Sequence, residues 1–322
     1  MNINCRISTL LNRIEKHYQR DNLLNSQYLI IKRACERSGL GLFAYYVTML
    51  SYIEYALSHG MTPVIDMQNY ANTFHQKGEV GKINTWELFF EQPCNVSLEE
   101  ALRSGKSRYV WNDIPEFHPN DSLDFLYNDD ILSYYHSVAE RYIRFQPDVL
   151  HILQQKEEEM FGEGEHNRER ILGVLARGTD YTNLKPYYNP IQPDLEQLVR
   201  IINEYCLKYS CEKIYVATED SDVLEYFISI YGDRLLYTDQ KRINNVTTYL
   251  YENKDFIDRD PFERGIEYLT SIYLLSRCNG LIAGRTTGTV GTCIMADHYE
   301  FKYIFSLGRY GLEDKILQNR CL

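Results

Sequence analysis

Residues 171–181, ILGVLARGTDY, decide the fold of this chain. The segment begins with an apolar run that predicts a buried strand, and Arg177, Gly178, Thr179 and Asp180 follow directly. Open α/β folds bind their ligands at the carboxyl ends of such strands. Arg177 therefore stands where it can hold an anion, because a guanidinium offers paired donors and stays charged. The alternative is an arginine that caps the strand end through carbonyls or a nearby carboxylate.

Strands and helices alternate regularly after this stretch. Further strands are expected at residues 213–218, 235–238, 280–284 and 301–306. Helices are expected at 195–206, from the acidic turn to 231, at 262–277 and from 286 to 297. Such alternation predicts a parallel, doubly wound sheet covered by helices.

The first half of the chain begins with another strand–helix–strand unit. Strands are expected at 28–32 and 63–66, with a helix at 43–58 between them and a polar helix at 1–25 ahead of them. Gly39 and Gly41 form a turn that opens the central helix and lets backbone amides approach a ligand. Two glycines alone are a weak match to a dinucleotide-binding fingerprint.

The charged stretch at 154–170 is the expected domain boundary, although the solvated end of a helix would have the same composition. It divides the chain into domains 1–160 and 161–322, which we expect to face each other across one deep cleft. At this size each domain can build its own core.

Composition excludes several classes of function. A formal net charge of -11 leaves no broad basic surface for nucleic acid or anionic lipid. The longest nearly apolar run, residues 40–50, is too short to span a bilayer, and Met1 opens no signal-peptide pattern, so a cytoplasmic protein is expected. The cysteines and histidines lack the spacing of a zinc site, a disulfide framework or a catalytic triad. We therefore expect no metal or other cofactor.

Three predicted strand ends in the second half carry polar groups that can meet in one crevice, at residues 177–180, 218–222 and 285–289. The third is a helix start with hydroxyls, a glycine and free amides, which suits an anion, and together with Arg177 it can clamp a diphosphate. Its alternative is an ordinary N-cap by Thr286 or Thr287. The acidic turn can accept hydrogen bonds from a ribose or a base edge, or Asp220 can simply cap the helix beside it.

The segments at these strand ends read, in order, GVLARGTDY, IYVATED and LLSRCNGLIAGRTTGTVG. They resemble the three motifs of GDP-fucose-dependent fucosyltransferases of the α1,6, nodulation-factor, α1,2 and protein O-fucosylating groups. The similarity covers residues 170–297, while the first domain matches loosely through its GLG turn, helix and VID strand. The resemblance implies two Rossmann-like domains in the GT-B arrangement, with the donor nucleotide in the second, the acceptor largely in the first, and a C-terminal tail that packs back on the first.

The resemblance also implies roles for individual residues. Arg177 matches the arginine that contacts the donor β-phosphate, and Asp180 matches the acid three residues on; both are the catalytic candidates. The wider donor site comprises Gly178, Thr218, Glu219, Asp220, Glu267, Arg285, Thr286, Thr287, Gly288 and Thr289, with Glu267 as the candidate for reading guanine. The candidates on the acceptor side or for the general base are Gly39, Gly41, Glu36 and Asp66, and Asp180 is a further candidate base.

Two positions depart from the family pattern. Leu175 stands where the α1,6 and α1,2 groups have histidine, and Gly178 stands where they have a second arginine. The phosphate clamp thereby loses one charge, which Lys185 or Arg285 can replace. The departure bears on the identity of the donor more than on the fold.

The function expected from the residues and the resemblance is an inverting, metal-independent glycosyltransferase. It moves L-fucose from GDP-fucose to a hydroxyl of a glycan acceptor in surface polysaccharide synthesis, in the cytoplasm or peripherally at the inner face of the membrane on a lipid-linked acceptor. Two alternatives remain open: a GT-B enzyme that uses another nucleotide sugar, and a non-catalytic protein that binds nucleotide sugars.

Overall fold

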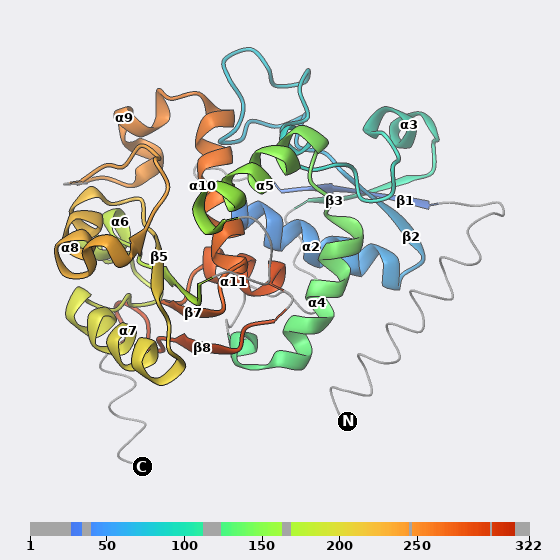
Figure 1. Ribbon diagram of the computed structural model, residues 1–322. Coiled ribbons are helices and arrows are strands. Elements are labelled where there is room, and N and C mark those ends of the chain that lie inside the picture. The colour runs from blue at the N-terminus through green and yellow to red at the C-terminus, as the bar shows by residue number, and fades with distance from the viewer. Residues whose placement is uncertain are drawn as a thin grey trace. The chain divides into compact units, whose positions relative to one another are not determined.

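The computed structural model describes residues 27–33, 40–111, 124–162, 169–244, 247–296 and 298–312. The chain divides into two compact units, Met1–Leu150 and His151–Leu322 (Figure 1). The polar helix expected at 1–25 lies outside the described residues, as do Glu36 and Gly39.

The first unit contains a parallel sheet of three strands in the order β2-β1-β3. The strands are β1 (Gln27–Lys32), β2 (Met61–Ile65) and β3 (Ser107–Trp111). Helix α2 (Leu42–Ser58) joins β1 to β2, so the expected strand–helix–strand unit is confirmed. The sequence did not predict β3, which pairs with the other side of β1.

Shorter elements complete this unit, and an aromatic cluster lies between them. They are η1 (Thr85–Leu88), α3 (Leu98–Arg103), η2 (Asp124–Tyr127) and α4 (Asp129–Tyr142). The ring of Phe90 lies 4.5 Å from that of Trp86 and 5.8 Å from that of Tyr46 on α2, which joins the 3-10 turn to the long helix. Helix α5 (Pro147–Phe161) crosses the division between the units, so the charged segment expected as the domain boundary is helical as far as Phe161.

The second unit contains a five-stranded parallel sheet in the order β6-β5-β4-β7-β8. The strands are β4 (Ile171–Leu175), β5 (Lys213–Ala217), β6 (Leu235–Leu236), β7 (Gly280–Ala283) and β8 (Phe301–Ile304). The chain runs from β4 outward to β5 and β6, then returns to the other side of β4 for β7 and β8. The strand order therefore reverses between β4 and β7, which is the place where open α/β sheets bind ligands.

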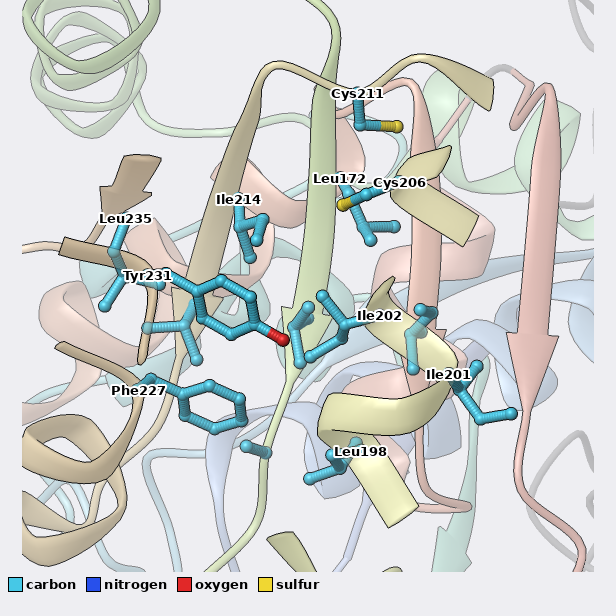
Figure 2. Packing of buried hydrophobic residues seen from close by; sticks show 14 of the residues in the cluster. Leu172, Leu198, Ile201, Ile202, Cys206, Cys211, Ile214, Phe227, Tyr231 and Leu235 are labelled. Carbon is cyan, nitrogen blue, oxygen red and sulfur yellow. The ribbon is translucent and has the colours of Figure 1, made fainter. Parts of the chain in front are cut away.

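Helices connect these strands on both faces of the sheet. They are α6 (Thr179–Asn183), α7 (Leu195–Tyr209), α8 (Ser221–Tyr231), η4 (Gly232–Arg234), η5 (Leu250–Glu252), α9 (Lys254–Ile257), α10 (Pro261–Ser276) and α11 (Thr287–Met295). Alternate residues of the strands pack under α7 and α8, where Ile202 and Phe227 are fully buried (Figure 2). On the opposite face a Cβ at Gly173 would meet Leu275 of α10 at 3.1 Å, so β4 and α10 pack closely. The expected doubly wound sheet is thus present in this unit.

Strand β6 is shorter than the sequence predicts. Its expected last residues, Tyr237 and Thr238, leave the sheet because Arg242 draws that segment into a loop: Nη2 of Arg242 donates to the carbonyl of Thr238 at 2.9 Å, and Nε donates to the carbonyl of Thr218 at 3.1 Å. The arginine thereby ties the ends of β5 and β6 together. Among the described residues, no helix is both long and apolar enough to cross a membrane.

Candidate functional site

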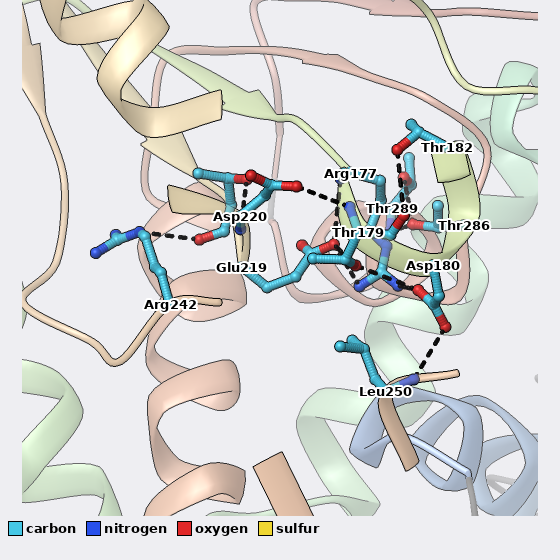
Figure 3. A network of polar contacts seen from close by, with 12 residues as sticks. Arg177, Thr179, Asp180, Thr182, Glu219, Asp220, Arg242, Leu250, Thr286 and Thr289 are labelled. Atoms are coloured by element: carbon cyan, nitrogen blue, oxygen red, sulfur yellow. Dashed lines mark hydrogen bonds and ion pairs between the residues drawn. The ribbon is translucent and has the colours of Figure 1, made fainter. Parts of the chain in front are cut away.

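The polar strand ends of the second unit meet at the carboxyl edge of its sheet, as the sequence predicts. Arg177 follows β4, Glu219 and Asp220 follow β5, and Thr286 follows β7. Figure 3 shows side chains from these three loops, and hydrogen bonds and an ion pair join the loop after β4 to the loop after β5. Two of the loops, after β4 and after β7, flank the point where the strand order reverses.

The guanidinium of Arg177 lies between two carboxylates. Its Nη2 is 3.2 Å from Oδ1 of Asp180, and its Nη1 is 3.4 Å from Oε1 of Glu219 (Figure 3). The ring of Tyr181 lies 4.6 Å from its Cζ. Burial lowers the pKa of Arg177, but the negative charges of Glu219 and Asp180 raise it by a larger amount. The net shift of the pKa is upward, so the guanidinium stays charged.

Arg177 still has a donor to offer. Its buried Nε has no hydrogen-bond partner among the described residues. A guanidinium has five N–H groups, and a buried donor without an acceptor is costly. An anionic ligand at this edge of the sheet would supply the missing acceptor.

The acidic pair after β5 fixes the backbone of the loop after β4. Oδ2 of Asp220 accepts from the amide of Thr179 at 2.9 Å, and Oε1 of Glu219 accepts from the amide of Gly178 at 3.2 Å. Thr179 has φ +49°, a strained conformation for a β-branched residue. Strain of this kind persists only where surrounding contacts fix the backbone. Here the bonds from Asp220 and Glu219 fix it, and they thereby keep Arg177 at the strand end.

Asp220 also caps the helix that follows it. Its Oδ1 accepts from the amides of Asp222 at 2.9 Å and Val223 at 3.3 Å, at the start of α8. Both of its oxygens therefore serve the protein's own backbone. Of the two interpretations that the sequence left open, the structure shows the cap for Asp220; Thr218 supports the turn by accepting from the amide of Asp220 at 3.2 Å.

Gly178 has no room for a side chain. A Cβ at this position would lie 2.5 Å from Oδ2 of Asp220 and 2.6 Å from its Cβ. The absence of an arginine here thus has a steric reason, since the carboxylate that fixes the loop occupies the space. A second cation for this site has to come from another loop.

The helix start after β7 is an N-cap with free amides behind it. Oγ1 of Thr286 accepts from the amide of Thr289 at 3.1 Å, so Thr286 is the N-cap of α11. This is the N-cap that the sequence left open as the alternative to an anion site. The hydroxyl of Thr289 turns inward to the carbonyl of Gly284. Thr287 is half-buried, and the first amides of a helix have no intrahelical acceptor. The helix start can therefore still receive an anion through its backbone.

Two tyrosines that the sequence analysis did not assign lie at this site. Tyr181 of α6 stacks on Arg177, and the hydroxyl of Tyr268 of α10 would be 2.6 Å from a Cβ at Gly288. Burial raises the pKa of both hydroxyls above the ordinary value, so both stay protonated. The sequence could have predicted Tyr181 as a site residue, because it follows Asp180 directly. Tyr268 could not be predicted in this way, because it belongs to a helix almost ninety residues further along the chain.

Of the remaining candidates in the second unit, Glu267 and Arg285 have partners within the protein. Glu267 pairs with Arg259 at 2.5 Å between Oε1 and Nη2. Arg285 donates from Nη1 to the hydroxyl of Ser306 at 3.4 Å, at the end of β8. Lys185 is exposed. Arg285 follows β7, one of the two strands between which the strand order reverses.

Asp66 of the first unit has both carboxylate oxygens engaged by neighbouring groups. It is fully buried at the end of β2, 2.9 Å from Nζ of Lys32, and it accepts from the amides of Gln68 and Asn69 at 3.0 Å. The side-chain amide of Asn69 contacts both of its oxygens. These contacts stabilise the carboxylate and occupy it. Gly41 is the extended N-cap of α2, with φ −71°, a conformation open to any residue.

Within the described ranges, no group of three or more His, Cys, Asp or Glu residues is placed to hold a metal ion. Residues 258–260, Asp-Arg-Asp, match the DxD sequence found at many nucleotide-bound metal sites. Asp260 is instead the N-cap of α10 and accepts from the amide of Glu263 at 3.0 Å.

No protein-family model matches the chain, and no curated protein matches it in sequence. Solved structures do match. The fucosyltransferase NodZ from Bradyrhizobium is 14% identical, with a TM-score of 0.53 over 89% of this chain and 97% of NodZ. Arabidopsis thaliana FUT1, solved with GDP, is 11% identical, with a TM-score of 0.50 over 94% of this chain and 78% of FUT1. POFUT1, also solved with GDP, is 9% identical, with a TM-score of 0.50 over 88% of this chain and 100% of POFUT1. The chain has the mixed α/β fold that these fucosyltransferases share.

Proposed function

We propose that this chain is an inverting fucosyltransferase of the GT-B arrangement that transfers L-fucose from GDP-fucose to a hydroxyl of a glycan. Two independent lines support the proposal. The order and spelling of the three motifs resemble those of GDP-fucose-dependent enzymes. The fold is that of NodZ, which has been solved both with GDP and after soaking with GDP-fucose.

A single observation carries the placement of the donor. The buried Nε of Arg177 has no acceptor among the described residues, and it lies at the point where the strand order reverses. Nη1 and Nη2 are already oriented by Glu219 and Asp180, so the guanidinium does not have to be ordered when a ligand arrives. A phosphate oxygen of the donor is the acceptor that fits this fixed, charged donor.

The chemistry requires stabilisation of negative charge on the departing diphosphate. As the acceptor hydroxyl attacks the anomeric carbon from the opposite face, the bond to the diphosphate breaks, the nucleotide leaves as GDP, and the hydroxyl proton passes to solvent. In this proposal Arg177 and the free amides at the start of α11 stabilise this charge, and preorganised donors of this kind are worth several kcal/mol in the transition state. Because Gly178 admits no side chain, we assign the second positive charge to Arg285.

The acidic residues near Arg177 orient it in this proposal. Asp180 and Glu219 already bond the guanidinium, and Glu219 also accepts from the hydroxyl of Thr179 at 2.9 Å. A general base has to accept the proton of the attacking hydroxyl, and both carboxylates are already engaged by the protein, so neither is assigned that role. We further propose that transfer needs no metal ion, and that the acceptor belongs to a surface polysaccharide, free or lipid-linked, that the enzyme meets in the cytoplasm.

The direct test is donor turnover. Purified protein is incubated with GDP-fucose and a panel of glycans, GDP release is measured, and products are examined by mass spectrometry for one added deoxyhexose. The proposal predicts GDP release from GDP-fucose that glycans accelerate, and slower release from GDP-mannose. Turnover of UDP-sugars in place of GDP-fucose would show that the enzyme uses another donor, and binding of GDP without any turnover would support the non-catalytic alternative.

A further inference from the structure

Helix α7 ends in a turn that brings two cysteines together. Ser210 adopts the left-handed conformation, with φ 56° and ψ 44°, and the amide of Cys211 donates to the carbonyl of Cys206 at 3.0 Å. This bond is the one that defines a Schellman helix end, and in that motif the side chains of the two bonded residues come into contact. A pair of apolar residues usually fills these positions, but here both residues are cysteine.

The two thiols interact with each other and with an arginine. Figure 2 shows both sulfurs at the same end of the cluster under α7. The hydrogen bond from the thiol of Cys211 lowers the pKa of Cys206, burial raises it, and the guanidinium of Arg234 lowers it again, for a net downward shift. Arg234 is held in place by its bonds to the carbonyls of Cys211 at 3.0 Å and Glu212 at 3.1 Å. Cys206 is therefore the more nucleophilic sulfur of the pair.

We propose that Cys206 and Cys211 form a redox-active dithiol site whose substrate is a low-molecular-weight disulfide. The thiolate of Cys206 attacks one sulfur of that disulfide, forms a mixed disulfide and releases one thiolate. The thiol of Cys211, whose pKa is raised by its hydrogen bond to Cys206 and by burial, gives its proton to the thiolate released in the first step. Its sulfur then attacks the sulfur of Cys206 and releases the second half of the small disulfide, which solvent protonates. The protein dithiol is oxidised to an intramolecular disulfide, and the small disulfide is reduced to two thiols.

The turn already supplies the geometry that the product needs. A disulfide joins Cα atoms about 4.4–6.8 Å apart, and the bond between the amide of Cys211 and the carbonyl of Cys206 keeps these backbones close. Other described cysteines lack this arrangement. Burial raises the pKa of Cys278, whose sulfur donates to the carbonyl of Leu274 at 3.3 Å. Selective oxidation of the pair is therefore expected.

The dithiol lies away from the proposed donor site. Cys206 lies in the last turns of α7 and Cys211 lies just before β5, at the amino edge of the sheet, whereas Arg177 lies at the carboxyl edge. Oxidation should consequently leave the affinity for GDP unchanged. The inference does not depend on the proposed function, because it concerns a different edge of the unit.

Trypsin makes the test direct. The folded, full-length protein is treated with glutathione disulfide, remaining thiols are blocked with N-ethylmaleimide, and the unfolded chain is digested without reduction. Trypsin cleaves after Lys208, between the two cysteines, so the disulfide would join peptides 201–208 and 209–213 into one species. We expect this linked species to be the main oxidised product, and reduction should separate it into the two peptides.

Two variants and one measurement complete the design. Cys206→Ser should abolish the linked species, whereas Cys94→Ser, in the first unit, should leave it unchanged. The melting temperature of the wild type should rise on oxidation, because a cross-link restricts the unfolded chain, and that of Cys206→Ser should not. Recovery of both peptides unlinked, with maleimide or glutathione on each, would overturn the proposal, as would a link that forms only after denaturation.

Discussion

Arg177 is more tightly held than its sequence position suggests. At the level of sequence we expect its side chain to point into a solvated cleft, but only 15% of it is exposed, and it separates Asp180 from Glu219. That expectation is wrong, and the reason is that the acidic pair after β5 packs against the loop after β4. Replacing Arg177 with alanine would leave two neighbouring carboxylates without their cation, at a cost of about 3–5 kcal/mol of folding free energy.

The informative substitution is therefore Arg177→Lys. The ammonium keeps the charge between the two carboxylates, so the melting temperature should change little, but it lacks the fork and the Nε donor. We expect the affinity for GDP to fall by about tenfold to a hundredfold, as the loss of a charge-assisted bond of about 1.5–3 kcal/mol implies. Isothermal titration calorimetry with a parallel melting curve measures both quantities.

Arg170→Lys is the matched control, because Arg170 precedes the same strand at its other end and binds Glu300 and the carbonyl of Tyr209. Its affinity for GDP should equal that of the wild type. Wild-type affinity in Arg177→Lys would show that Arg177 is a structural residue and that the donor lies elsewhere.

Gly178 provides the second residue-scale prediction. Restoring the second arginine of the family pattern by Gly178→Arg should lower both stability and GDP affinity, since any Cβ collides with Asp220. Gly178→Ala should also destabilise, by about 1–3 kcal/mol, as overpacking does. Urea unfolding of both variants provides the comparison. A stable Gly178→Arg protein that binds GDP more tightly would refute the steric explanation.

At the scale of elements, periodicity located most of the second unit. Strands β4, β5, β7 and β8 begin where the apolar runs predict, and the polar residues behind three of them gather at one edge. The sequence could not show which polar groups serve the protein and which remain for a ligand. The bonds of Asp220 to Thr179, and of Glu267 to Arg259, join residues that fold into contact, and no local pattern encodes them. Strand β3 was missed for a different reason, which is that its five residues show no clear alternation of apolar and polar side chains.

The start of α11 separates capping from binding. Thr286→Ala removes the N-cap and should cost about 1 kcal/mol of stability. Thr287→Ala removes a hydroxyl that caps no helix amide among the described residues, so it should leave stability unchanged. If the helix start binds the diphosphate, Thr287→Ala should weaken GDP binding by roughly twofold to tenfold, the value of one neutral hydrogen bond. Thermal melts and GDP titrations of both variants, with Thr286→Ser as the conservative control, test this. Unchanged GDP binding in Thr287→Ala would remove its hydroxyl from the donor site.

At the scale of the whole molecule, the described residues that we propose for the donor side all belong to the second unit. The first unit supplies a smaller parallel sheet, and its role as the acceptor side remains part of the proposal. If the donor site lies in the second unit, GDP, which lacks the sugar, should bind to residues of that unit alone.

Dependence on metal is a second property of the whole protein. Since cationic side chains and helix amides are proposed to neutralise the diphosphate, transfer from GDP-fucose should persist in excess EDTA at close to the untreated rate. Initial rates with and without the chelator, in protein dialysed beforehand, measure this. Loss of activity that manganese or magnesium restores would show that an ion performs the role assigned here to Arg177 and Arg285.

Nucleotide selectivity tests the central claim most directly. Calorimetric titration of the wild-type protein with GDP, UDP, ADP and CMP compares four bases under one set of conditions. The account predicts that GDP binds at least about tenfold more tightly than the others, a difference of about 1.4 kcal/mol, and that Arg177→Lys weakens GDP binding. Equal affinities for all four nucleotides, or binding of UDP alone, would contradict it.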